Sequence, residues 1–283
     1  MHKIAPEFLA LQRLYHWEKT APQRVALTQP MGGDVVQDFT WAEVADQSRR
    51  MAAYLQAQGW APGSKVAILS KNCAWWMMSD LAIWMAGYVS VPLYPTLAPE
   101  TITQILTHSE SQACFIGKLD GWEHMKPGVP AGLPCISYPL SPDDARSAYE
   151  GWDAIVARTA PMGTSPTRAE DDLATLIYTS GTTGMPKGVM HSFGNFAWAL
   201  DRGLQRIPLT QDDRMLSYLP LAHVVERMLV EHGWLRTAMH VYFAESLDTF
   251  TADLQRARPT VFFSVPRLWV KFQQGIHHKM PPA

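Results

Sequence analysis

Short apolar runs alternate with longer helical patterns in the first half of the chain. Residues 65–70 predict a buried strand, and they are followed by a helix at 73–87, a strand at 89–94, a helix at 98–110 and a strand at 112–117. Strands built of near-continuous apolar residues are typical of a parallel sheet covered by helices on both faces. The pattern therefore predicts a β-α-β-α-β unit.

The same rhythm returns towards the end of the sequence. The predicted elements there are a strand at 214–220, a helix at 223–238, a strand at 240–245, a helix at 247–259, a strand at 260–266 and a helix at 267–280. Residues 118–170 are rich in Pro, Gly, Ser and Asp, which favours loops with one helix at 149–158. We expect an α/β fold with two packed βαβ-type subdomains and mostly parallel sheets covered by helices. The first would span about 60–186, and the second about 20–59 together with 187–283.

One amphipathic helix carries its own start and stop signals. Thr40 followed by Glu43 matches a capping box, and Gly59 is a natural end for the helix. Its apolar positions, expected to face the core, are Trp41, Val44, Ala45, Met51, Ala52 and Leu55. We expect a structural role for this helix.

Residues 74–94 are apolar enough to raise the question of a membrane span, with Asp80 as their one charge. Asp80, the interruption at Gly87 and the strand-like end favour a buried helix followed by a buried strand. Several tryptophans recur at helical spacing and are predicted to be core residues, namely Trp75, Trp76, Trp84, Trp198 and Trp234.

Composition narrows the class of protein further. The 283 residues are 47% hydrophobic and 18% charged, which is typical of an ordered globular protein. A net charge of -2 and the lack of a basic cluster give no indication of a nucleic-acid-binding surface. Cys73, Cys114 and Cys135 are far apart, which fits reduced, buried thiols. The N-terminus lacks a secretory signal pattern, so we expect a cytoplasmic protein.

The segment YTSGTTGMPKGV, residues 178–189, follows an apolar run suited to a buried strand and precedes a helical pattern that begins near Ser192. A glycine-rich turn after a strand exposes backbone N–H groups that form an anion site. The candidate phosphate-binding residues are Thr179, Ser180, Gly181, Thr182, Thr183, Gly184 and Lys187. Lys187 lies between Pro186 and Gly188, so the segment is not a Walker A loop. The alternative is a surface turn enriched in small residues.

This segment resembles the phosphate-binding signature of the adenylate-forming superfamily, which includes acyl-CoA synthetases, luciferases and the adenylation domains of peptide synthetases. Residues 216–227 (LSYLPLAHVVER) resemble the next core motif of that family. Residues 264–276 (SVPRLWVKFQQGI) resemble a segment of its long-chain fatty acid ligases. The resemblance covers nearly the whole chain.

The resemblance implies a two-step reaction. A carboxylate, most simply that of a long-chain fatty acid, attacks the α-phosphate of Mg-ATP, and a thiol, usually coenzyme A, then displaces AMP. The loop would hold the β and γ phosphates, and His223 would form a wall of the acyl and AMP pocket. Glu226 and Arg227 are expected to be an exposed helical pair without a catalytic role, and His191 to be the residue before an N-cap at Ser192.

The chain also departs from the family pattern. It stops at Ala283, so the family's Mg-binding acid, ribose-binding Asp and catalytic lysine have no counterpart in it. We therefore expect an N-terminal part of such an enzyme, with a C-terminal portion missing and little or no ligase activity alone. Three alternatives stay open: another acid, a carrier-protein acceptor, or a non-catalytic nucleotide-binding or interaction module. Peripheral membrane contact is also left open.

Overall fold

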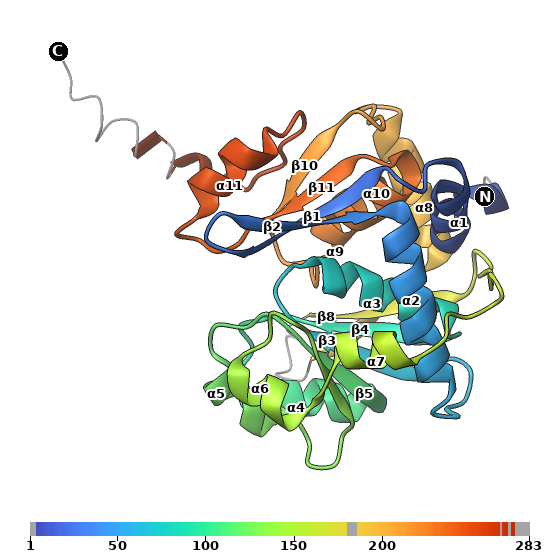
Figure 1. The fold of residues 1–283 in the computed structure, drawn as a ribbon, viewed down its shortest axis with the longest axis vertical. Helices are drawn as coiled ribbons and strands as arrows, with labels where there is room; N and C mark the ends of the chain where they lie inside the picture. The colour runs from blue at the N-terminus through green and yellow to red at the C-terminus, as the bar shows by residue number, and fades with distance from the viewer. Residues whose placement is uncertain (1–3, 180–185, 267, 271–272, 275–283) are drawn as a thin grey trace.

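The computed structural model describes residues 4–179, 186–266, 268–270 and 273–274, and it shows two β-sheets with helices between and around them (Figure 1). The smaller sheet contains β1 Val25–Gly32, β2 Val35–Thr40, β10 Arg214–Ser217 and β11 His240–Phe243, in the order β10-β11-β1-β2. The larger sheet contains β3 Lys65–Leu69, β4 Val89–Leu93, β5 Ser111–Ile116, β6 Cys135–Ser137, β7 Glu150–Gly151, β8 Leu173–Thr179 and β9 Lys187–Ser192, in the order β7-β6-β5-β3-β4-β8-β9. The pairs β1–β2 and β8–β9 are antiparallel, whereas the other described pairs are parallel.

The helices connect these strands. They are α1 Ala10–Thr20, α2 Trp41–Gln56, α3 Ala74–Met85, α4 Pro99–His108, α5 Trp122–Met125, α6 Asp143–Ala148, α7 Trp152–Arg158, α8 Phe193–Leu204, α9 Val224–Glu226, α10 Gly233–Thr237 and α11 Phe250–Ala257. A π-helical segment, Arg227–His232, joins α9 to α10, and short 3-10 turns occupy Pro6–Phe8 and Lys126–Gly128. Figure 1 shows α3 between the two sheets and α4, α5 and α6 on the far side of the larger one.

The predicted α/β class with mostly parallel sheets is confirmed. The predicted strands of the first unit are β3, β4 and β5, and β3 pairs in parallel with both of the others. Helix α3 is buried on every side, which is expected for a helix that is apolar all round. None of the helices in the described part of the chain combines the length and apolar character needed to cross a bilayer.

Helix α2 begins and is anchored as its sequence predicts. The Thr40 side chain accepts a hydrogen bond from the backbone of Glu43, and the Glu43 carboxylate accepts one from the backbone of Thr40 at 2.7 Å. The chain turns away at Gly59, where φ is +73°, a conformation that glycine adopts without strain. All of its predicted apolar positions are buried.

Three element predictions need correction. Residues 118–170 hold α5, α6 and the strands β6 and β7 in addition to the expected helix, so they extend the larger sheet. Strand β9 was not predicted, because its exposed residues Val189 and Met190 break the alternation of buried and exposed positions expected of a half-buried strand. The third correction concerns residues 260–266, which form no strand.

Residues 260–266 follow the open edge of β10 without forming a ladder. The backbone N–H groups of Thr260 and Val261 both donate to the carbonyl of Arg214, and the Tyr218 hydroxyl donates to the carbonyl of Phe263. Pro259 and Pro266, which lack an N–H group, bracket the segment. Much of the predicted final helix lies outside the described residues.

The core is shared by both sheets through α2 and α3. Trp75, Trp76, Trp84 and Trp234 are core residues as predicted, and Trp234 stacks on Trp41 at 4.4 Å between ring centroids. The prediction for Trp198 is wrong, because 49% of this residue is exposed on the outer face of α8. All three cysteines are free, with Cys73 and Cys114 buried and Cys135 only half-buried.

Candidate functional site

The carboxyl ends of parallel strands from the two sheets meet at one edge. Asn72, just after β3, donates to the carbonyl of Leu219 at 2.6 Å, and its own side-chain oxygen accepts from the backbone of Leu221 at 2.9 Å. Lys118, just after β5, donates to the carbonyl of Ala244, which directly follows β11. Ligands of open parallel sheets bind outside the carboxyl ends of the strands, so this edge is the candidate site.

The two described ends of the predicted phosphate loop lie at this same edge of the larger sheet. Thr179 and Lys187 are register partners at the base of the antiparallel pair β8–β9, and both are exposed. Ser180, Gly181, Thr182, Thr183 and Gly184 lie outside the described residues. The described flanks show that the segment follows strand β8, as predicted, and that the unpredicted strand β9 stands between it and the helix after Ser192.

The base of this hairpin is packed against α4. The hydroxyl of Tyr178 lies 2.7 Å from Nδ1 of His108 at the end of α4, and their rings meet edge to face. Gly188, the register partner of Tyr178, lies under the tyrosine ring, since a Cβ there would be 3.1 Å from the ring carbon Cζ. These contacts fix the position of the last residues of β8.

His191 lies just before helix α8, as the sequence predicts. Ser192 is the N-cap of α8, and it forms a capping box with Asn195. The ring of His191 lies against Phe196 at 5.3 Å. Burial, followed by the positive charge of Arg227, lowers the pKa of His191. The structural interpretation of this histidine therefore stands.

His223 begins the helical turn that follows β10. It is exposed, and its Nδ1 accepts a hydrogen bond from the backbone of Val225 at 3.2 Å. A neutral histidine with Nδ1 as acceptor carries its proton on Nε2, which makes Nε2 a donor. Within the described part of the chain, no hydrogen bond joins His223 to Thr179 or Lys187.

Glu226 and Arg227 are not an exposed pair, and this expectation is wrong. Glu226 is 3% exposed, and one of its oxygens, Oε1, accepts from the Ser217 hydroxyl and from the backbone of Tyr218, both at 3.0 Å. Desolvation raises the pKa of Glu226 to about 8, even though its hydrogen bonds favour the charged form.

Arg227 is fully buried among groups of the larger sheet and α3. Its guanidinium forms an ion pair with Asp80 and another with Glu231, and it donates to the hydroxyls of Thr175 and Ser90. Burial raises the pKa of both carboxyl groups, while Arg227 opposes that rise. Asp80 is the one charged residue of the apolar helix α3. Because a buried carboxylate needs a partner of opposite charge, this residue could have indicated from the sequence that a buried cation lies nearby in the fold.

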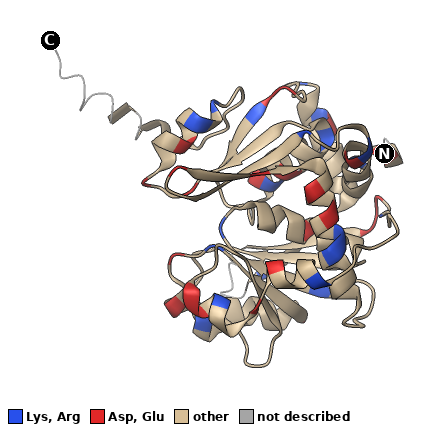
Figure 2. Ribbon diagram, in the orientation of Figure 1, with Lys and Arg blue, Asp and Glu red and all other residues tan. Residues whose placement is uncertain are grey.

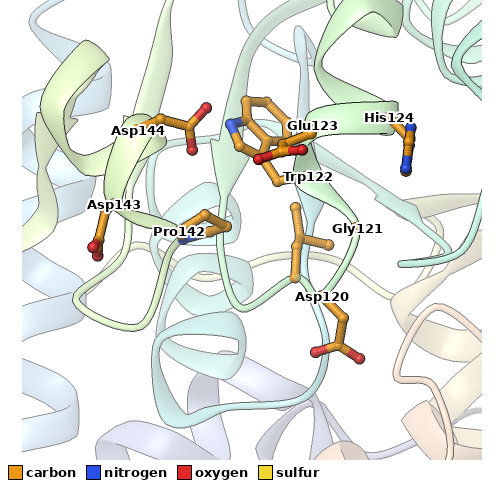
Figure 3. A pocket seen from close by; sticks show the side chains of 9 residues that line it. Asp120, Gly121, Trp122, Glu123, His124, Pro142, Asp143 and Asp144 are labelled. Carbon is orange, nitrogen blue, oxygen red and sulfur yellow. The ribbon is translucent and has the colours of Figure 1, made fainter.

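A cavity of about 420 Å³ opens beside α5 and α6 (Figure 3). Its lining is acidic, with Asp120, Glu123, Asp143 and Asp144. Figure 3 shows these carboxylates pointing in different directions. Within the described part of the chain, no group of three or more His, Cys, Asp or Glu side chains is arranged to hold a metal ion. The cavity is therefore not a candidate metal site.

A second cavity, of about 160 Å³, is apolar. It lies between α8, β10, the π-helical segment and residues 261–263, and it is lined by Leu200, Leu204, Met215, Met228, Leu229 and Phe263 among others. Met228 and Leu229 lie five and six residues after His223, in the π-helical segment. The cavity can therefore accommodate an apolar group against this segment. Figure 2 shows both signs of charge along α2 and α6 rather than one basic face.

Two α/β sheets whose carboxyl ends meet, with both ends of a hydroxyl- and glycine-rich segment at that edge, are typical of nucleotide-binding α/β proteins. The family model for AMP-binding enzymes matches residues 14–282, and the chain belongs to this family. The resemblance to the adenylate-forming superfamily is thereby confirmed.

Curated relatives include long chain acyl-CoA synthetase 1 of Arabidopsis thaliana, which is 30% identical over 84% of this chain and 38% of its own length. Long-chain-fatty-acid–CoA ligase FadD15 of Mycobacterium bovis is 31% identical over 91% of this chain and 44% of its own length. The chain thus spans less than half the length of these relatives.

Solved structures share the fold. A benzoate CoA ligase from Burkholderia xenovorans superposes with a TM-score of 0.78 at 22% identity, over 92% of this chain and 51% of that chain. O-succinylbenzoate coenzyme A synthetase from Bacillus subtilis, in complex with ATP and a magnesium ion, superposes with a TM-score of 0.74 at 24% identity, over 93% of this chain and 51% of that chain.

Proposed function

We propose that the chain is the N-terminal part of an ATP-dependent acid–CoA ligase that acts through an acyl-adenylate. The observation that carries this proposal is the pairing of Thr179 with Lys187 at the base of the β8–β9 connection, at the carboxyl edge of a parallel sheet. An exposed ammonium beside hydroxyls and glycine N–H groups is suited to a polyphosphate. Membership of the AMP-binding family supports ATP as its source.

The proposed roles follow the sequence motif. Thr179, Ser180, Gly181, Thr182, Thr183, Gly184 and Lys187 would bind the β and γ phosphates of ATP. Mg²⁺ would enter with the nucleotide, because it binds mainly through substrate phosphates and keeps several waters. The Bacillus subtilis relative, whose structure is in complex with ATP and a magnesium ion, supports ATP and Mg²⁺ as the ligands. We assign no catalytic residue and no metal ligand in this chain.

In the proposed reaction, a carboxylate oxygen of the acid bonds to the α-phosphorus and pyrophosphate leaves with the electrons of the broken P–O bond. Coenzyme A then attacks the acyl carbon through its thiol and releases AMP. The residues of this chain would hold the pyrophosphate end and offset its charge through Lys187, which is a contribution of positioning and electrostatics. His223 would form a wall of the pocket for the acyl group and AMP.

We further propose a long-chain fatty acid as the acid. The apolar cavity beside Met228 and Leu229 supports an apolar substrate, and the two curated relatives named above carry long-chain names.

The proposed division of the chain, near residue 60 and near residue 186, stays a prediction, although β9 continues the larger sheet to Ser192. A cytoplasmic location with peripheral access to membrane lipid also stays a prediction.

Ligand binding by the full chain tests this proposal. Calorimetric titration and thermal shift with Mg-ATP, and with the N-palmitoylsulfamoyl ester of adenosine as a stable acyl-adenylate mimic, should show binding. Ligand at 100 times its dissociation constant stabilises the folded state by about 2.7 kcal/mol. Lys187→Ala should weaken Mg-ATP, whereas Lys19→Ala, in the last turn of α1, should not. If the wild type bound neither Mg-ATP nor the acyl-adenylate mimic, the proposal would be contradicted.

The rival proposal is a non-catalytic nucleotide-binding module. Binding of Mg-ATP without fatty-acid-dependent exchange of pyrophosphate into ATP is the result expected of such a module. Exchange above background would exclude it.

A further inference from the structure

Two consecutive residues tie one helical turn to both sheets. Glu226 points to the smaller sheet, where it accepts from Ser217 at the end of β10 and from the backbone of Tyr218. Arg227 points to the larger sheet, where it donates to Ser90 of β4 and Thr175 of β8, both at 2.8 Å. The turn is therefore fixed relative to two sheets at once.

The anchor at Arg227 is rigid. Its guanidinium donates four side-chain hydrogen bonds, and all four acceptor residues are buried, namely Asp80, Glu231, Thr175 and Ser90. The rings of Trp76, Trp84 and Phe196 lie between 5.3 and 5.9 Å from its Cζ atom. A planar donor fork held by several acceptors and stacked on aromatic rings has little freedom to move.

The same turn carries His223. The backbone N–H of Arg227 donates to the carbonyl of His223 at 3.1 Å, and Nδ1 of His223 accepts from Val225 inside the turn. The π-helical segment begins at Arg227, and such segments are frequent at functional sites. A displacement of Arg227 would pass directly to the backbone of His223, and so to the direction of its ring.

We propose that Arg227 and Glu226 are positioning residues, which together fix the imidazole of His223 at the carboxyl edge where the two sheets meet. The inference rests on the proposed function only for the statement that His223 contacts the acyl-adenylate. The placement of the ring itself depends on contacts within this chain.

The first test compares Arg227→Lys with a matched control, Arg49→Lys. Arg49 is also a mostly buried arginine, paired with Glu18 and stacked on Tyr15, but it joins α2 to α1 away from His223. Lysine keeps the positive charge of arginine but lacks the planar guanidinium, which can donate to several acceptors at once. Nitrogen NMR of isotope-labelled histidine, with the His223 signal assigned by its loss in His223→Gln, reports which ring nitrogen carries the proton.

We expect Arg227→Lys to convert His223 from the single Nε2–H tautomer to a mixture and to weaken the palmitoylsulfamoyl-adenosine complex by about 10- to 100-fold, the loss expected of a misplaced contact group. Arg49→Lys should lower thermal stability and leave both readouts unchanged. A folded Arg227→Lys protein with the wild-type His223 signal would overturn the proposal. So would an equal change in the Arg49→Lys protein.

Milder variants keep the test decisive if Arg227→Lys does not fold. Thr175→Val removes one acceptor from Arg227, and Glu226→Leu removes the anchor to the smaller sheet, while Glu226→Gln retains an oxygen for the same donors. We expect the His223 signal to shift in Thr175→Val and Glu226→Leu and to be retained in Glu226→Gln. Unchanged signals in the first two would overturn positioning. Failure of the wild type to bind the adenylate mimic would contradict the proposed function alone, because the NMR readout needs no ligand.

Discussion

At the scale of single residues, the carboxyl group of Glu226 links the stability of the fold to pH. Its pKa is about 8 in the folded chain against 4.5 for the ordinary group, because burial disfavours the charge. The folded state therefore holds a proton that the unfolded state releases between these values. The stabilising contribution is fully present below the unfolded pKa and is lost as the pH rises through about 8.

Glu226→Gln should remove this dependence. Glutamine supplies the same acceptor oxygen for Ser217 and Tyr218 but cannot ionise. At about pH 4 the variant and the wild type should unfold alike, whereas at about pH 9 the variant should be more stable by about 2–5 kcal/mol, given 1.36 kcal/mol for each pKa unit. Urea unfolding across this range measures the difference. A constant difference in unfolding free energy between Glu226→Gln and the wild type across this range would show that Glu226 is already charged when folded.

Gly188 illustrates a packing constraint on the predicted phosphate-binding motif. A methyl group at this position would lie 3.1 Å from Cζ of Tyr178, which is closer than ordinary contact, so the tyrosine ring must move from its place beside His108. We expect Gly188→Ala to reduce the free energy of unfolding by about 1–2 kcal/mol through overpacking. Gly163→Ala, where the added methyl meets open space, is the matched control. Equal unfolding midpoints in urea for the two variants would refute this contact.

At the scale of elements, periodicity predicts those whose environment is uniform. Helix α3 is buried throughout and strand β3 is buried at every residue after Lys65, so their apolar runs are unambiguous. Residues 260–266 carry the same apolar signal but lie along the open edge of β10, and no local pattern says whether a neighbour is available for a ladder. Strand β9 exposes Val189 and Met190, which breaks the expected alternation of a half-buried strand.

The start of α2 offers a test of capping energetics. Thr40 satisfies the backbone of Glu43, and its loss would leave that N–H group at the helix start without its partner. We expect Thr40→Ala to lower the free energy of unfolding by about 1 kcal/mol and Thr40→Ser to be near neutral. Chemical denaturation of both variants provides the measurement. A serine variant as unstable as the alanine one would show that the methyl group of Thr40, rather than its hydroxyl, is what matters.

At the scale of the whole molecule, only part of the candidate site can be predicted from the sequence. The motif at 178–189 and His223 each belong to one short segment, so local residue types suffice to propose them. The bonds of Glu226 and Arg227 reach residues distant in sequence, such as Asn72, Asp80 and Thr175. A helical pair of opposite charge looks the same whether solvent or two sheets surround it, and only the fold distinguishes these cases.

The two sheets are expected to unfold together because they share one core. Buried residues of a single cluster come from both sheets and from the helices between them, including Leu27, Val241, Val66, Phe115, Val44 and Trp76. Calorimetry, circular dichroism and tryptophan fluorescence should therefore report coincident transitions. Separate transitions would show that the division near residues 60 and 186 marks independent folding units.

Asn72 tests how strongly the carboxyl edges contribute to this unity. Its amide donates to Leu219 and Ser217 and accepts from Leu221, so it bonds the chain after β3 to the chain at and after β10. Asn72→Ala would leave buried backbone groups without partners and should cost about 2–4 kcal/mol. We expect one transition at a lower temperature, because the shared apolar core remains. If the transition instead splits in two, the polar contacts at this edge, rather than the core between the sheets, are what make the fold cooperative.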